Sequence, residues 1–124
     1  GITTQNHKLT SMKKVLFILF LVGAQQGYAQ LIKTQLILKV VDELGNPVAE
    51  ASVKLYETEA DYAKEVNTAF EGTTDAKGVV QFKKMKAIQY YLIVRKDDKD
   101  NMGGGEKVGP LEENKFNKAT VVIQ

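Results

Sequence analysis

From about residue 30 onward the chain alternates between apolar and polar positions in short runs, which predicts β-strands. In residues 35–42, for example, Leu36, Leu38 and Val40 fall on one face of an extended chain. The same period predicts further strands at residues 51–57, 70–74, 79–83, 89–96, 107–111 and 116–123. Seven short strands at this spacing are typical of a sandwich, so we expect an all-β, seven-stranded, two-sheet antiparallel Greek-key sandwich.

The alternation also predicts which side chains lie between the two sheets. Each strand contributes apolar residues at every second position, and we expect these residues to share one core. They are Leu36, Leu38, Val40, Val53, Leu55, Phe82, Leu92, Val94, Val121 and Ile123.

Turn signals separate the strands. Residues 44–47 (LGNP) and 75–78 (DAKG) place Gly, and in the first case Asn, where the chain must reverse and where positive φ is useful. Residues 58–66 break the two-residue period, and Thr58 followed by Asp61 predicts the N-cap of a short helical turn. The last two strands are expected to form a hairpin around residues 112–115.

The segment before the strands has the pattern of a cleavable signal peptide. Lys13 and Lys14 follow Met12, residues 15–22 are all apolar, and Gly27-Tyr28-Ala29 matches a small-x-small cleavage site. The apolar run is far shorter than the roughly 20 residues that span a bilayer. We therefore expect upstream residues plus a signal peptide in 1–29, a β-sandwich domain in 30–124, a periplasmic or secreted protein, and no transmembrane anchor after cleavage.

Charge and cysteine content narrow the function classes. Of the 17 Lys and Arg residues, three precede residue 30, which leaves 14 against 15 Asp and Glu and a net charge of −1. Without a basic patch, nucleic acid is not an expected partner. The chain contains no cysteine, so the core must hold the domain together without disulfides.

Four stretches in order carry a family resemblance. They are residues 41–48 (VDELGNPV), 51–53 (ASV), 73–82 (TTDAKGVVQF) and 90–94 (YYLIV). Together they resemble the transthyretin-like sandwich family, particularly the carboxypeptidase regulatory-like domain. The resemblance implies a stabilising, binding or linker module of envelope or secreted proteins, and a fold alone does not choose among these roles.

The residues that most often perform catalysis are missing from the predicted domain. After residue 29 there is no His or Cys, and Ser52 is the only serine. Nucleophilic catalysis by Ser or Cys normally needs a positioned base, most often His, and zinc sites normally use His or Cys. We therefore expect no enzyme activity, no catalytic residue and no cofactor, and an enzyme of unrecognised type is the last alternative.

Two further chemistries deserve a residue-level hypothesis. Lys39 and Asn117 lie on the first and last predicted strands, and related pilin-type domains cross-link a Lys to an Asn in such strands. No carboxylate in residues 89–96 is available to catalyse the bond, so we expect Lys39 and Asn117 to be two solvated residues.

Asp97, Asp98 and Asp100 are the candidate calcium ligands. Because Lys99 interrupts them and the EF-hand spacing fails, we expect a solvated loop rather than a metal site.

Aromatic and apolar residues on outward positions offer two binding surfaces. Tyr56, Tyr62, Tyr91 and Phe70 could stack against a sugar, which makes a carbohydrate-binding module the first alternative function. Ile37, Tyr56, Tyr91 and Ile93 would form an apolar partner surface if their strands are neighbours. Alternatively, residues 58–66 or 97–106 fold over this face and bury it. The favoured function is an exported, non-catalytic binding or accessory module that engages an envelope or extracellular protein.

The signal peptide leads to a direct prediction. The exported protein should begin at Gln30, because signal peptidase accommodates the small side chains of Gly27 and Ala29. Mass spectrometry of the exported protein measures this. A mature protein that keeps residues 15–22 would contradict the prediction of export by cleavage.

Overall fold

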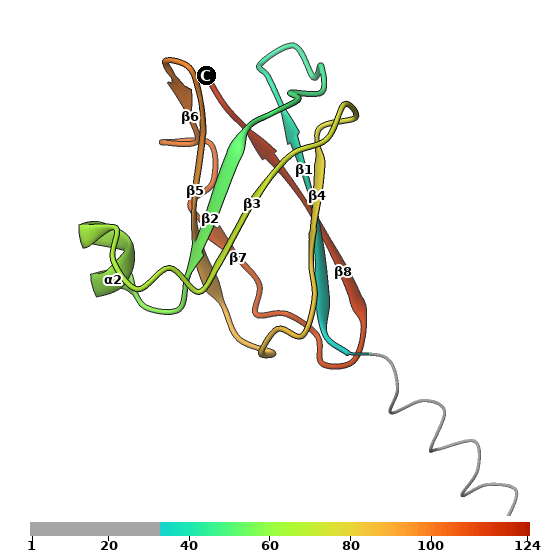
Figure 1. The fold of residues 1–124 in the computed structure, drawn as a ribbon, viewed down its shortest axis with the longest axis vertical. Helices are drawn as coiled ribbons and strands as arrows, with labels where there is room; N and C mark the ends of the chain where they lie inside the picture. Colours follow the sequence, from blue (N-terminus) through green and yellow to red (C-terminus); the bar gives the residue numbers. More distant parts are fainter. Residues whose placement is uncertain (1–32) are drawn as a thin grey trace, which may run out of the picture. The chain divides into compact units, whose positions relative to one another are not determined.

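The computed structural model describes residues 33–124, which form two facing β-sheets and one short helix (Figure 1). The predicted signal peptide lies outside the described residues. The strands are β1 (Gln35–Val41), β2 (Ser52–Tyr56), β3 (Phe70–Thr73), β4 (Val79–Phe82), β5 (Tyr90–Lys96), β6 (Lys99–Asp100), β7 (Lys107–Val108) and β8 (Phe116–Val122), and the helix is α2 (Glu59–Lys64). The predicted all-β, two-sheet class is confirmed.

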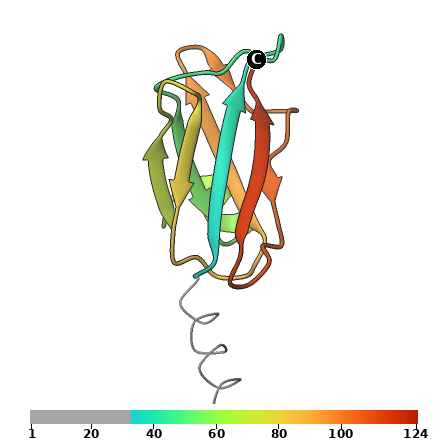
Figure 2. The same ribbon diagram turned by 90° about the vertical axis from the view of Figure 1, so that its right-hand side faces the viewer.

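The first sheet has three strands in the order β4-β1-β8, and Figure 2 looks onto it. β1 pairs with β4 in antiparallel fashion and with β8 in parallel, from Gln35 opposite Phe116 to Val41 opposite Val122. The second sheet has five strands in the order β3-β2-β5-β6, with β7 also paired to β5. The prediction of a wholly antiparallel sandwich of seven strands is therefore wrong, and Greek-key order stays a prediction.

The predicted hairpin between residues 107–111 and 116–123 does not form. β7 pairs with β5 in the five-stranded sheet, whereas β8 pairs with β1 in the three-stranded sheet. The segment between them crosses from one sheet to the other, and Leu111 is buried on the way, with its N–H bonded to the Ile88 carbonyl at 3.1 Å. Local alternation identifies a strand but carries no information about its partner, which explains the error.

The predicted core is confirmed at all ten positions. Each of those residues is buried in one cluster between the sheets. Ala51, Met85, Tyr90, Val108 and Leu111 complete the cluster. Gly72 of β3 lies against β4 so closely that an added Cβ would come within 2.9 Å of a Val80 methyl, so the absence of a side chain lets this flank of the sandwich close.

The predicted helical turn is present as α2. The Thr58 hydroxyl caps it by accepting a hydrogen bond from the Asp61 N–H at 3.1 Å, as the sequence indicates. The helix ends at Glu65, which takes the left-handed conformation with φ 52°. Within residues 33–124, no helix has the length and apolarity that crossing a membrane requires.

Two turns at the same end of the sandwich are built alike. In each, an aspartate (Asp42 or Asp75) accepts hydrogen bonds on Oδ1 from the backbone N–H groups two and four residues later. Three residues on, Gly45 and Gly78 take φ of 85° and 76°, and each donates its N–H to the aspartate carbonyl. Asn46 does not share this positive φ, contrary to the expectation for the first turn. The pKa of both aspartates is lowered, and the main cause is the hydrogen bond from the backbone N–H four residues later, which is that of Asn46 for Asp42 and that of Val79 for Asp75.

Truncation of a central core residue should test the packing. Leu92 is 1% exposed. The variant Leu92→Ala should lower the free energy of unfolding of the domain by about 2–5 kcal/mol, because it leaves a cavity between the sheets. Urea unfolding measures the loss. Leu44→Ala is the matched control, since Leu44 is 87% exposed and should change stability by less than about 0.5 kcal/mol. A Leu92→Ala loss as small as that of the control would contradict the assignment of the inner face.

The aspartate turns should make stability depend on pH. Because the pKa of Asp42 and Asp75 is lowered in the fold, their ionised form stabilises it above their ordinary pKa of about 4, and this contribution is lost as pH falls through the lowered values. Melting temperature followed downward from neutral pH should fall more steeply for the wild type than for the double variant Asp42→Asn, Asp75→Asn. The amide keeps an acceptor but does not titrate. Identical pH profiles would contradict the role of the carboxylates.

Candidate functional site

The four residues of the expected partner surface do not lie together. Tyr56 of β2 is opposite Tyr91 of β5, and Ile93 follows on the same outer face of the five-stranded sheet. Ile37 belongs to β1 in the other sheet. The condition that their strands are neighbours therefore fails for Ile37, and the patch reduces to three residues on one sheet.

Helix α2 covers this reduced patch. Its Tyr62 packs between the two tyrosines beneath it, with ring centroids 6.3 Å from Tyr56 and 5.7 Å from Tyr91. Tyr56 is fully buried and Ile93 is 9% exposed. The alternative in which residues 58–66 fold over the face is the arrangement found. Under this cover, the buried Tyr56 hydroxyl has no hydrogen-bond partner among residues 33–124.

A hollow of about 250 Å³ lies beside α2, above β5 and the start of the loop after β6. Two of its three charged groups pair with each other, because the Arg95 guanidinium donates to both Glu65 carboxylate oxygens at 2.6 and 3.1 Å, and the third, Asp100, accepts a hydrogen bond from the Met102 N–H. This pair lowers the pKa of Glu65 and raises that of Arg95. Met102 closes the rim, with its sulfur 3.9 Å from the Tyr62 hydroxyl. The hollow thus contains polar groups that hold α2 on the sheet.

Asn101 at the base of the hollow is a structural residue that the sequence reasoning missed. It is 1% exposed, and its amide accepts from the Val94 N–H at 3.0 Å and donates to the carbonyls of Leu92 and Gly105 at 2.9 and 2.8 Å. The side chain thereby takes the place of strand backbone along β5 between β6 and β7. An Asn in a glycine-rich loop signals a turn, but nothing local shows that its amide faces a strand.

The candidate calcium ligands serve in a turn instead. Asp97 takes φ 55° in the tight connection between β5 and β6, and Asp100 accepts a hydrogen bond from the Met102 N–H at 2.9 Å. Among the described residues, no group of three or more His, Cys, Asp or Glu side chains is placed to hold a metal ion. Asp97, Asp98 and Asp100 are therefore not brought together as ligands.

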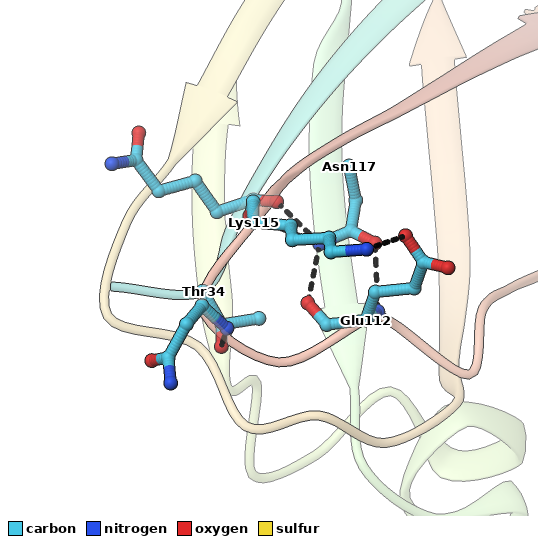
Figure 3. A network of polar contacts seen from close by, with 6 residues as sticks. Thr34, Glu112, Lys115 and Asn117 are labelled. Carbon is cyan, nitrogen blue, oxygen red and sulfur yellow. Dashed lines mark hydrogen bonds and ion pairs between the residues drawn. The ribbon is translucent and has the colours of Figure 1, made fainter. Parts of the chain in front are cut away.

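The geometry also separates Lys39 from Asn117. β8 places Asn117 opposite the buried Leu36, on the inner face, whereas the exposed Lys39 lies opposite Thr120 on the outer face. Figure 3 shows the Asn117 amide pointing into the loop before β8, where it accepts from the Glu112 N–H at 2.8 Å and donates to carbonyls including that of Glu112 at 3.0 Å. Asn117 fastens this loop, and no cross-link with Lys39 is possible across the sheet.

The proposed sugar-stacking row is likewise divided. Tyr56, Tyr62 and Tyr91 gather under α2, but Phe70 packs inward, with ring centroids 5.9 Å from both Phe82 and Tyr90. A sugar face needs exposed rings in one plane, and Tyr56 is buried. The aromatic arrangement does not support carbohydrate binding.

Comparison with known proteins adds a likeness of fold. No protein-family model matches the chain, and no curated protein matches it either, so the transthyretin-like resemblance stays a prediction. Among solved structures, the chain is similar to the pilus 2b backbone protein of group B streptococcus, with a TM-score of 0.53 and 20% sequence identity. The match covers 73% of this chain and 40% of the pilus protein. At this identity the likeness shows a shared β-sandwich-like fold.

Proposed function

We propose that the protein is an exported, non-catalytic module of the cell envelope that works by binding another protein. The proposal includes the predicted signal peptide and membership of the transthyretin-like sandwich family, and it covers both a periplasmic and a secreted location. A pilus backbone protein has a similar fold, and this analogy of fold supports the proposed class of function.

The observation that carries the proposal is how the polar side chains are used. The Arg95–Glu65 pair holds α2, the Asn101 amide completes β5, and Asn117 fastens the loop before β8. Catalysis needs groups that are free to meet a substrate in a concave site. Here the polar groups that border the hollow at α2 are hydrogen-bonded to other parts of the same domain. This arrangement favours binding through the protein surface over catalysis in the hollow.

Cross-linking in the native envelope tests the proposal. A tagged chain is treated with a lysine-reactive cross-linker in intact cells and then purified, and a specific partner protein should be recovered with its links on defined lysines of the sandwich. Gly78→Val is the matched control, because a Cβ at Gly78 would lie 2.6 Å from the Val40 carbonyl oxygen and disrupt the fold. Equal recovery with this variant would contradict binding by the folded module.

Enzyme assays test the proposal that the module is non-catalytic. The purified domain should give no turnover above background in panels of hydrolase substrates at neutral pH. Turnover that disappears on replacing a single carboxylate, such as Asp75→Ala or Asp98→Ala, would overturn the non-catalytic assignment.

A further inference from the structure

The outer edge of β8 is the longest open strand edge in residues 33–124. β8 has seven residues, whereas β3 and β4 have four each and β6 and β7 have two each. Among the described strands, β8 pairs only with β1, and Figure 2 shows it as the last strand on its side of the three-stranded sheet. An open edge presents unpaired backbone groups to which another extended chain can bond.

The hydrogen-bond register identifies which groups are free. In a parallel pair, alternate residues of a strand bond to the neighbour. The Gln35 N–H donates to the Lys115 carbonyl at 3.0 Å. In this register, the odd-numbered residues of β8 direct their backbone N–H and C=O groups toward β1. The N–H and C=O groups of Phe116, Lys118 and Thr120 therefore point away from β1, and all three residues are exposed. Within the described chain, β8 has no strand partner other than β1, so no second strand bonds to these groups.

The free stretch has a defined end. Beyond Thr120, the loop after β6 comes close to the strand, because an added Cβ on Gly104 would lie 2.4 Å from the Val122 carbonyl oxygen. Just past β8, Gln124 bonds with Asp100 of β6 through two backbone hydrogen bonds of 3.0 and 3.3 Å. The loop thus closes the far end of the edge and leaves residues 116–120 open.

The outer sheet face beside this stretch is positively charged. Lys118 lies on the outer face of the three-stranded sheet opposite Ile37, and Lys39 lies on the same face one pair of residues further along β1. Neither lysine forms an ion pair within residues 33–124. The outward positions of β1 and β8 carry no carboxylate: they are Gln35, Ile37, Lys39, Val41, Phe116, Lys118, Thr120 and Val122.

We propose that the β8 edge at residues 116–120 binds an extended segment of a partner protein by strand addition, with a carboxylate of that segment beside Lys118. The proposal rests on the proposed function and names its surface and the chemistry of its partner. The segment would alternate, with apolar residues beside Asn117 and Ala119 of the inner row and polar residues on the outer face.

A second copy of the chain fits this edge poorly. The antiparallel pairing that uses all the free groups is centred on Lys118, so the two Lys118 side chains would lie directly opposite each other. Like charges at that position destabilise a strand pair. The same lysine that disfavours self-pairing favours an acidic segment, so a different protein is the expected occupant.

Direct binding of model peptides tests the proposal. The fluorescent peptide Val-Thr-Val-Glu-Val-Thr-Val is titrated with the domain and compared with the peptide whose central Glu is replaced by Lys. Cross-strand charge pairing predicts that the Glu peptide binds about two- to fivefold more tightly. Hydrogen exchange should slow at the amides of Phe116, Lys118 and Thr120 when the peptide binds. No binding, or protection at other amides only, would overturn the proposal.

Two pairs of variants locate the contact. Lys118→Glu should reverse the preference between the peptides, whereas Lys99→Glu on β6 should leave it unchanged. Thr120→Pro removes one free N–H at the edge and should weaken binding about fivefold, whereas Thr120→Ala should not. If Thr120→Pro fails to fold, the reversal by Lys118→Glu decides alone. Unchanged preference in Lys118→Glu would overturn the assignment of the edge.

Two other outcomes separate this inference from the function on which it rests. A partner that is cross-linked in the envelope, and whose recovery is unaffected by Lys118→Glu, would overturn the edge while the proposed function stands. Dimerisation that protects the same three amides without peptide would also overturn it, because the occupant would then be a second copy. Peptide binding at the edge without any partner recovered from the envelope would support the edge as a strand-binding surface and would count against the proposed function.

Discussion

Strand β1 supports the whole three-stranded sheet through its hydrogen bonds on both sides. It pairs with β4 along one edge and with β8 along the other, and these two strands have no other strand partner in the described chain. Its inward residues Leu36, Leu38 and Val40 are fully buried against the other sheet. Both edges and one face of β1 are therefore in contact with other strands, so the first described strand is bonded directly to the last. β1 bonds to only one edge of β8, which leaves the other edge of β8 open.

Polar side chains replace strand backbone at several points where the sheets are incomplete. Asn101 bridges the gap between β6 and β7, and Asn117 fastens the loop before β8. The buried Thr74 hydroxyl accepts from the Ala51 N–H at 2.9 Å and donates to the Val48 carbonyl at 2.7 Å. A buried backbone group without a partner costs free energy, so these side chains allow a sandwich with two-residue strands to remain satisfied.

The two sheets differ in how they present their outer faces. The five-stranded sheet has an aromatic face, but α2 covers it through Tyr62 and the ion pair between Glu65 and Arg95. The buried Tyr56 hydroxyl, which has no hydrogen-bond partner within the described part of the chain, is the cost of that cover. The three-stranded sheet carries exposed lysines and an exposed Phe116, and no helix of residues 33–124 covers it (Figure 1). A surface for a partner is therefore more accessible on the smaller sheet.

The sequence by itself determined seven of the eight strands, the capped helical turn, the turn that begins at Asp75 and all ten predicted core residues. These features depend on side-chain alternation, on a Thr that caps its own helix and on Asp-x-x-Gly geometry, all of which act within a few residues. Only the tertiary structure decided that β8 pairs in parallel with β1, that Ile37 lies apart from Tyr91, and that the Asn101 amide meets β5. Pairing between residues distant in the chain depends on which edges and faces remain free after the sheets pack, and no local pattern encodes that choice.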